Sequence, residues 1–132
     1  MTPKRDLKIT TIGAGYVGLV TGVCFSDFGY DVTCVDKDVR KIEKLAAGEM
    51  PIFEAGLEAL VHRNLGEGRL HFTTELTQAA PQADVVFIGV GTPPAEDGSA
   101  DLQYVMAAAR ELAPLLKGFT VIAIKSLSLI HI

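Results

Sequence analysis

Three glycines near the start of the chain have the spacing of a phosphate-binding turn. Gly13, Gly15 and Gly18 fit the pattern G-x-G-x-x-G. The first permits a tight turn out of a strand, the second lets a pyrophosphate approach the backbone, and the third lets a helix pack closely on a sheet. A β-branched run precedes them and an apolar helical pattern follows, so we predict a phosphate site at a helix N-terminus. A glycine-rich turn that serves packing alone is the alternative.

A single carboxylate stands where a dinucleotide would need one. Asp36 follows the third glycine by 18 residues, at the end of the predicted strand DVTCVD. A carboxylate there accepts hydrogen bonds from an adenosine ribose, and its charge favours NAD over NADP. The cations of Lys37, Arg40 and Lys41 weaken that preference because they can neutralise a 2′-phosphate. Asp36 also suits the N-cap of the next helix, and the two roles can coexist.

The loop after the most apolar predicted strand offers a third contact region. It contains Val90, Gly91 and Thr92 and continues into two prolines. Ligands of open α/β sheets bind beyond the carboxyl ends of the strands. The small residues permit a dinucleotide to approach, and Thr92 adds a hydroxyl. A stiff Gly/Pro turn without a ligand is the alternative interpretation.

Alternating strand and helix patterns must position these residues. The predicted strands cover residues 7–12, 31–36, 70–73, 84–90 and 120–125, and the predicted helices cover residues 16–28, 38–47, 54–65, 74–80 and 102–116. We expect the second helix to turn these side chains inward: Val39, Ile42, Leu45 and Ala46. Thr74 is a candidate cap for the fourth helix, and Asp101 or Ser99 for the fifth. The alternation predicts an α/β fold, a Rossmann-type doubly wound parallel sheet, truncated after about five strands.

Composition and charge exclude several classes of protein. The chain has 132 residues, the size of one domain, and its 48% hydrophobic and 21% charged residues are the balance of a folded chain. The net charge of −4 lacks the basic footprint of a nucleic-acid-binding protein. No apolar run approaches the ~20 residues of a membrane helix. Two cysteines are too few for a disulfide framework, which favours a cytoplasmic location.

The remaining nucleophilic and metal-binding residue types form no reactive cluster. Cys24 lies in a helical pattern and Cys34 in a strand, where free cysteines are usually buried packing residues. His62, His71 and His131 are too scattered for a metal-ligand spacing. We therefore expect neither a catalytic nucleophile nor a metal site in this chain.

Five longer strings are more specific than the glycine pattern. They are TIGAGYVGLVTG, VDKDVRKIEKLAAGEMPIFEAGLEAL, GRLHFTTEL, ADVVFIGVGTPPAEDGSADLQYV and VIAIKS, and they cover nearly all of the chain to Ser126. Together they resemble the nucleotide-sugar dehydrogenases, the UDP-glucose/GDP-mannose dehydrogenase family. The resemblance implies NAD contacts at Gly13, Gly15, Tyr16, Val17, Gly18, Asp36, Lys41, Val90, Gly91 and Thr92.

The resemblance also implies an activity. The family oxidises the primary alcohol of a nucleotide sugar twice, through a cysteine thiohemiacetal and thioester, and reduces two NAD. The cysteine, lysine, aspartate and glutamate involved lie in family segments beyond position 132, so no catalytic residue is assigned in this chain. With UDP-glucose as the leading substrate, the full-length enzyme is expected to be a cytoplasmic homodimer without nucleic-acid or membrane partners.

Two departures from the family pattern bear on the extent of the domain. Ala55 stands where the family has Pro. After Lys125 and Ser126, residues 127–132 do not fit the family's Lys-Ser-Thr-Val-Pro turn, and a Thr expected to contact NAD is missing. We therefore expect residues 1–126 to form the NAD-binding domain, 127–132 to be foreign or misread, and the substrate domain to be absent.

Such a chain is expected to bind NAD without turning over substrate. Three other interpretations stay open. The chain could be part of a UDP-N-acetylmannosamine or GDP-mannose dehydrogenase, a non-catalytic NAD-binding module, or a truncated product that does not fold.

Overall fold

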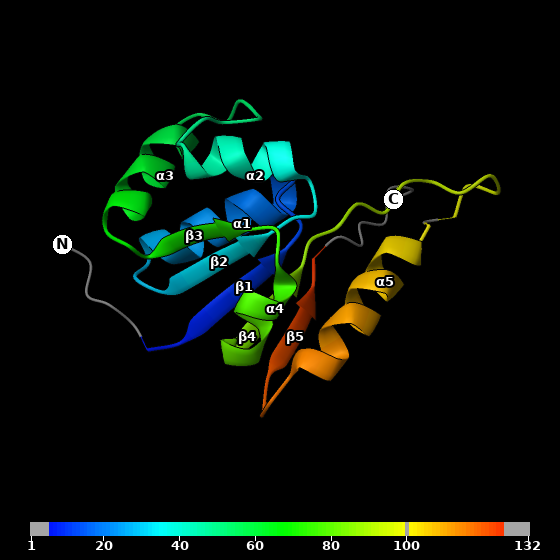
Figure 1. Cartoon of the computed structure of the whole chain (residues 1–132). Coiled ribbons are helices and arrows are strands. Elements are labelled where there is room, and N and C mark those ends of the chain that lie inside the picture. The colour runs from blue at the N-terminus through cyan, green and yellow to red at the C-terminus, as the bar shows by residue number, and fades with distance from the viewer. Residues whose placement is uncertain (1–5, 100, 126–132) are drawn as a thin grey trace.

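The protein is described by a computed structural model that covers residues 6–99 and 101–125. The predicted tail, residues 127–132, lies outside them. The described part contains a five-stranded parallel sheet in the order β3-β2-β1-β4-β5 (Figure 1). The strands are β1 (Lys8–Ile12), β2 (Asp31–Val35), β3 (Leu70–Thr73), β4 (Val85–Ile88) and β5 (Val121–Ile124). The strand order reverses between β1 and β4, which is the arrangement of a Rossmann-type sheet.

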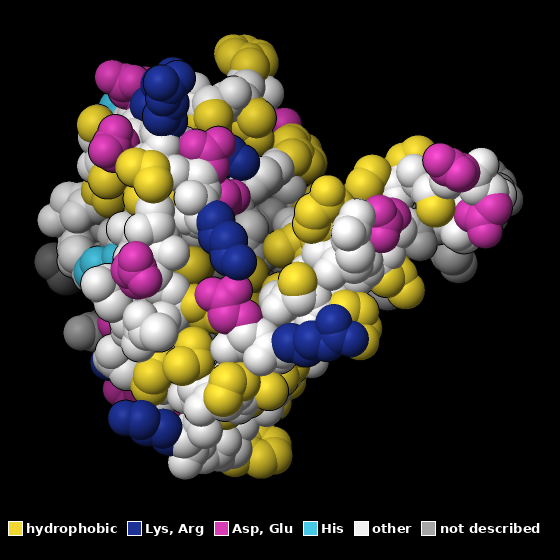
Figure 2. Space-filling model, turned by 45° about the vertical axis from the view of Figure 1, so that its right-hand side comes forward, with side chains coloured by type: hydrophobic (Ala, Val, Ile, Leu, Met, Phe, Trp, Pro, Cys, Tyr) yellow, Lys and Arg dark blue, Asp and Glu magenta, His cyan; other side chains and the backbone are white. Residues whose placement is uncertain are grey.

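Helices cover both faces of this sheet (Figure 1). One face carries α1 (Tyr16–Asp27), α2 (Val39–Ala46) and α3 (Leu57–Gly66). The other face carries α4 (Leu76–Ala79) and α5 (Gln103–Leu112), which are followed by the short 3-10 helices η1 (Ala80–Gln82) and η2 (Ala113–Leu115). Seen from another side, the segment with α5 and its preceding loop projects from the body as an arm (Figure 2). The predicted α/β, doubly wound class is confirmed.

Apolar side chains form one packed layer on each face of the sheet. Toward α1, α2 and α3 the buried side chains include Ile9, Leu19, Val23, Val32, Leu45, Val61 and Leu70. Toward α4 and α5 they include Ile12, Val35, Val86, Ile88, Val105 and Leu112. Each large apolar side chain contributes about 1.5–3 kcal/mol on full burial. The two layers therefore fix the carboxyl ends of β1, β2 and β4 relative to one another.

Glycine and proline decide where two helices begin and end. The predicted start of the third helix at residue 54 is wrong, because Gly56 adopts a left-handed φ of 82° and caps a helix that begins at Leu57. The predicted end of the fifth helix at residue 116 is also wrong. α5 ends at Leu112, and Pro114 lies in a 3-10 turn because it has no N–H to continue the helix.

Neither α4 nor α5 has the predicted side-chain cap, and the N-cap of α5 is Leu102, which makes no side-chain cap hydrogen bond. Thr74 does not cap α4. The hydroxyl of Thr73 accepts the N–H of Glu75 at 3.1 Å, and α4 has no side-chain cap. The carboxylate of Asp101 accepts the N–H of Gln103 at 3.0 Å, just before the first turn of α5. The hydroxyl contact before α4 therefore comes from the residue before the predicted one, and the order of the elements is unchanged.

The inward face of α2 is narrower than predicted. Ile42 and Leu45 are buried, but Val39 is 55% exposed and Ala46 is exposed. At 100° per residue, Val39 and Ala46 both lie on the side of Ile42 that is turned away from Leu45. The helix therefore meets the core through a stripe centred between Ile42 and Leu45, and the prediction for the other two side chains is wrong.

Candidate functional site

A cavity of about 440 Å³ opens where β1, β2 and β4 end. It lies at the reversal of strand order, where open α/β sheets bind ligands. The predicted contact residues that line it are Gly13, Gly15, Asp36, Lys41, Val90 and Gly91. The others lie beside it or in its supporting turns: Tyr16, Val17, Gly18 and Thr92.

The turn between β1 and α1 contains backbone contacts that require glycine. Gly13 has a φ of 99° and donates its N–H to the carbonyl of Val35 at 2.7 Å. A Cβ on Gly18 would overlap the carbonyl oxygen of Gly13. A Cβ on Gly15 would meet no atom within 4 Å, so the space beside this residue is open to a ligand.

Backbone N–H groups of the first turn of α1 lie beside that space and have no hydrogen-bond acceptor from a capping side chain. Gly15 is the N-cap and offers no side chain to accept the helix N–H groups. The first four N–H groups of a helix have no partner within the helix, and the positive end of the helix dipole adds to them. Together they form a site that fits a phosphate group.

The loop after β4 packs directly against this turn. β4 ends at Ile88, so the predicted strand end at residue 90 is wrong. Gly89 still donates its N–H to the carbonyl of Ile12 at 2.8 Å, and a Cβ added to it would lie 3.1 Å from the Cα of Gly18. The chain then turns away from the sheet, and Val90 and Gly91 form part of the cavity wall.

Asp36 ties the end of β2 to the glycine turn. Its Oδ2 accepts the N–H of Ala14 at 2.9 Å, and its Oδ1 accepts the N–H of Asp38 at 2.9 Å. The ammonium group of Lys41 lies 3.4 Å from Oδ2. Burial alone would raise the pKa of Asp36, but the two N–H donors and the Lys41 charge hold the pKa below its usual value of 3.8. The side chain is therefore ionised at neutral pH, and its hydrogen bonds hold the carboxylate in a fixed position.

The cap of α2 is a different residue from the one considered in the sequence. Asp38 is the N-cap, and its carboxylate accepts the N–H of Lys41 at 3.1 Å. Asp36 precedes the cap by two residues. Each carboxylate oxygen can accept about two hydrogen bonds, so Oδ1 of Asp36 retains capacity for a donor from a ligand.

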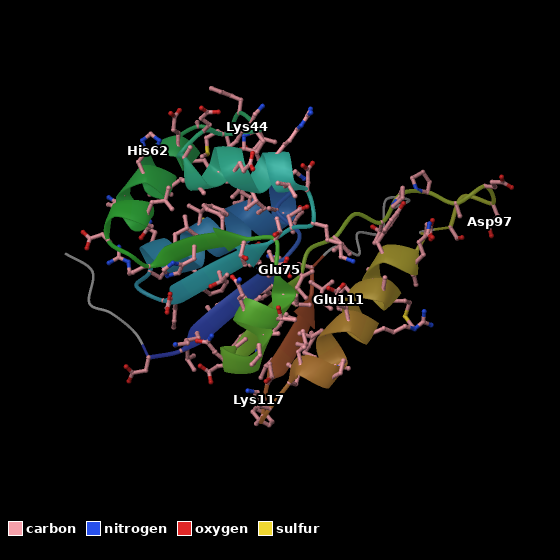
Figure 3. All side chains as sticks on the ribbon, in the orientation of Figure 1. Lys44, His62, Glu75, Asp97, Glu111 and Lys117 are labelled. Atoms are coloured by element: carbon pink, nitrogen blue, oxygen red, sulfur yellow. The ribbon has the colours of Figure 1, made fainter. Side chains whose placement is uncertain are left out.

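Helix α5 supplies a wall of the cavity that the sequence analysis missed. Tyr104, Ala107, Ala108 and Glu111 share one face of α5 and line the cavity. Figure 3 shows Glu111 on the side of α5 that faces the sheet, and its Oε2 lies 3.0 Å from the Nζ of Lys37. The spacing of these side chains was visible in the sequence. Which face of the helix would meet the cavity was not.

Both cysteines lie away from the cavity. Cys34 is buried in β2, and burial raises its pKa to about 11. Cys24 is half-buried in α1. Neither side chain lines the cavity, so neither is placed to attack a ligand there. Within residues 6–99 and 101–125, no group of three or more His, Cys, Asp or Glu side chains is arranged to hold a metal ion.

The PIFEAGL loop bounds a second cavity. This space, about 760 Å³, is lined by residues 50–56 and the first turns of α3, and Phe53 stands 96% exposed beside it. A hydrogen bond to the carboxylate of Glu54 raises the pKa of the Tyr16 hydroxyl, so this loop contacts the first turn of α1.

None of the helices in the described part of the chain is both long and apolar enough to cross a membrane.

Comparisons with known proteins agree with this geometry. The model of the UDP-glucose/GDP-mannose dehydrogenase family, NAD binding domain, matches residues 7–131. The UDP-glucose 6-dehydrogenase of Rhizobium meliloti is 62% identical over 121 residues, which are 91% of this chain and 28% of that protein.

Solved structures match over a similar extent. A UDP-glucose dehydrogenase from Pyrobaculum islandicum has a TM-score of 0.81 and 43% identity, covering 85% of this chain and 26% of its own. The UDP-N-acetyl-mannosamine dehydrogenase Cap5O from Staphylococcus aureus has a TM-score of 0.82 and 35% identity, covering 89% and 28%. The chain spans about a quarter of the length of these relatives.

Proposed function

Because the chain belongs to the UDP-glucose/GDP-mannose dehydrogenase family, we propose that its cleft holds NAD during the oxidation of a nucleotide sugar. The matched domain is the NAD-binding domain of that family, so the predicted cofactor is confirmed. The observation that carries the proposal is the convergence of three features on one cavity: the uncapped first turn of α1, the fixed carboxylate of Asp36, and the small residues after β4.

The described residues fit the parts of a dinucleotide. The N–H groups of residues 15–18 would hold the diphosphate, because the space beside Gly15 is open. Asp36 would accept from a ribose hydroxyl through its spare capacity, with Lys41 beside it. The dinucleotide would contact Val90, Gly91 and Thr92 in the loop after β4. Bound NAD supplies the acceptor for the hydride that leaves the alcohol carbon.

UDP-glucose is the proposed substrate of the longer protein, with the uronic acid as its product. The identity of 62% to a relative named UDP-glucose 6-dehydrogenase supports this choice over an N-acetylmannosamine sugar, since Cap5O is 35% identical. The longer protein is further proposed to be a cytoplasmic homodimer that binds neither nucleic acid nor membranes. The dimer is supported by the family resemblance alone.

By itself the 132-residue chain is proposed to bind NAD without oxidising the sugar. Hydride transfer requires both reactants within near-attack distance. In the described residues, the cavity has no cysteine in its lining. Residues 1–126 are proposed as the NAD-binding domain, with the groups that react with the sugar elsewhere in the longer protein.

Calorimetric titration with NAD tests the proposal. We expect the chain to bind NAD and a Gly15→Ala variant to bind at least about tenfold more weakly, because the new Cβ enters the space left for the diphosphate; tenfold corresponds to about 1.4 kcal/mol. Gly66→Ala is the matched control, since its Cβ would also meet no atom within 4 Å but lies at the end of α3. Failure of the parent to bind NAD, or equal affinities in the two variants, would contradict the proposal. NADH formation from UDP-glucose by the pure chain would contradict the proposal that the groups that react with the sugar lie elsewhere in the longer protein.

A further inference from the structure

Three cations stand next to the carboxylate that would meet the adenosine ribose. Lys37, Arg40 and Lys41 follow Asp36 within five residues. Cations at this place are the usual means of accepting the extra 2′-phosphate of NADP. The preference for NAD therefore depends on how these cations are engaged, as well as on Asp36 itself.

Two of the cations are paired with carboxylates. Lys41 lies 3.4 Å from Asp36, and both side chains are largely buried, with 29% and 18% exposed. Lys37 is paired with Glu111 at 3.0 Å. Glu111 comes from α5, far along the chain, yet both partners line the same cavity. The second pair thus joins the end of β2 to α5 beside the proposed ribose position.

We propose that Glu111 is a specificity-determining residue that engages Lys37 and so disfavours a 2′-phosphate beside Asp36. The inference rests on the proposed NAD function of the cleft. Glu111 acts in two ways in the same direction. It forms an ion pair with the ammonium group of Lys37, which is then less available to a phosphate. It also places a second negative charge beside the position that a 2′-phosphate would take.

The exposure of the pair sets the size of the effect. The side chains of Lys37 and Glu111 are 81% and 44% exposed, so water and salt screen them. An exposed pair of this kind contributes at most about 1 kcal/mol, or about fivefold in an equilibrium constant. Glu111 is therefore expected to tune the choice between NAD and NADP, whereas Asp36 makes the larger contribution.

Titrations of NAD and of NADP into the 132-residue chain test the inference. The measured quantity is the ratio of the NADP to the NAD dissociation constant at low ionic strength. We expect Glu111→Gln to lower this ratio about threefold to fivefold, because Lys37 is released and a like charge is removed. Adding Lys37→Gln to Glu111→Gln is expected to cancel most of that change. Glu67→Gln removes the same charge from the exposed end of α3 and is expected to leave the ratio unaltered.

The outcomes separate this inference from the proposed function. If the parent binds NAD but Glu111→Gln leaves the ratio unchanged, the inference is overturned and the NAD site stands. If the ratio falls equally when Lys37 is also replaced, the engagement of Lys37 is overturned. If the parent binds neither dinucleotide, the proposed function fails and the inference fails with it. Circular dichroism of each variant establishes that the comparison is between folded chains.

Discussion

The carboxylate of Asp36 combines a structural and a binding role in one side chain. Its separation of 18 residues from the third glycine correctly predicted a position next to the end of β2, which the structure has at Val35. Its hydrogen bond to the N–H of Ala14 was not predictable from that separation. The contact arises because β1 and β2 pair in register, with Ile12 opposite Val35, so the chain segments that follow both strands meet.

Acid titration should reveal how much the hydrogen bonds of the Asp36 carboxylate to Ala14 and Asp38 stabilise the fold. Its pKa is lowered in the folded chain, so the folded state binds this proton less readily than the unfolded chain. Its contribution to the free energy of unfolding is complete above the ordinary carboxyl pKa of 3.8 and is lost as pH falls through the lowered pKa. We expect the parent to lose stability more steeply below about pH 4 than an Asp36→Asn variant. Urea unfolding between about pH 2 and pH 6 measures this. Parallel pH curves for the two chains would show that the contacts of Asp36 contribute nothing to stability.

Substitution by alanine should destabilise the fold at Gly18 much more than at Gly15, three residues earlier. Gly18→Ala forces a Cβ into the carbonyl oxygen of Gly13, and overpacking of this kind costs about 1–3 kcal/mol. Gly15→Ala meets open space and should cost less, about 0.5–1 kcal/mol, because alanine is a poorer N-cap than glycine. Equal unfolding midpoints for the two variants in urea would contradict the close packing of β1 on α1.

Individual elements were predictable where their own residues decide the structure. The strand LHFT was predicted with the bounds that the structure shows, Leu70–Thr73, because a glycine and a polar turn flank it. The start of α3 was not predicted. The helical spacing lies in the apolar residues from Leu57 onward, and the prediction began the helix at Glu54, which the left-handed Gly56 excludes. The polar contacts between α3 and β3 also escaped prediction, since they join side chains from three separate segments.

Buried polar groups link the end of α3 to the start of β3. Asn64 is fully buried, and its Oδ1 accepts hydrogen bonds from two nitrogens of the Arg69 guanidinium, at 3.2 and 2.8 Å. Its amide nitrogen donates to the carbonyl of Leu60 at 2.8 Å and to the carboxylate of Asp27 at 3.2 Å. The amide therefore holds α1, α3 and β3 together through one side chain.

Removal of this amide should destabilise the fold. We expect Asn64→Ala to lower the free energy of unfolding by about 2–3 kcal/mol, because the buried Arg69 loses the amide oxygen that accepts two of its hydrogen bonds. Arg63→Ala, which removes an exposed partner of Asp27, should cost less than about 1 kcal/mol. Denaturant unfolding of both variants provides the comparison. An Asn64→Ala chain as stable as the Arg63→Ala chain would show that the contacts contribute little.

The molecule as a whole leaves apolar surface at one end of its sheet. β5 is the outermost strand of the described sheet, and about half of each of Val121, Ile122 and Ile124 is exposed. Phe119, just before the strand, is 91% exposed. Edge strands with exposed apolar side chains favour association between copies. The sequence pattern predicted this strand.

Self-association should therefore depend on β5. We expect the parent chain to associate reversibly with rising concentration, and a Val121→Lys variant to associate less, because a lysine on an edge strand opposes pairing. Val121 begins β5, at the opposite end from the cleft, so NAD titration serves as the control for an intact site. Sedimentation velocity measures the association. A parent that stays monomeric, or a variant that associates equally, would exclude β5 as the contact.

A crystal structure of the chain with NAD is the decisive experiment on the proposed binding site. We expect the diphosphate beside Gly15 at the first turn of α1, and a ribose hydroxyl within hydrogen-bonding distance of the Asp36 carboxylate. A dinucleotide bound in the cavity of the PIFEAGL loop around Phe53, or anywhere else away from the carboxyl ends of β1, β2 and β4, would contradict it.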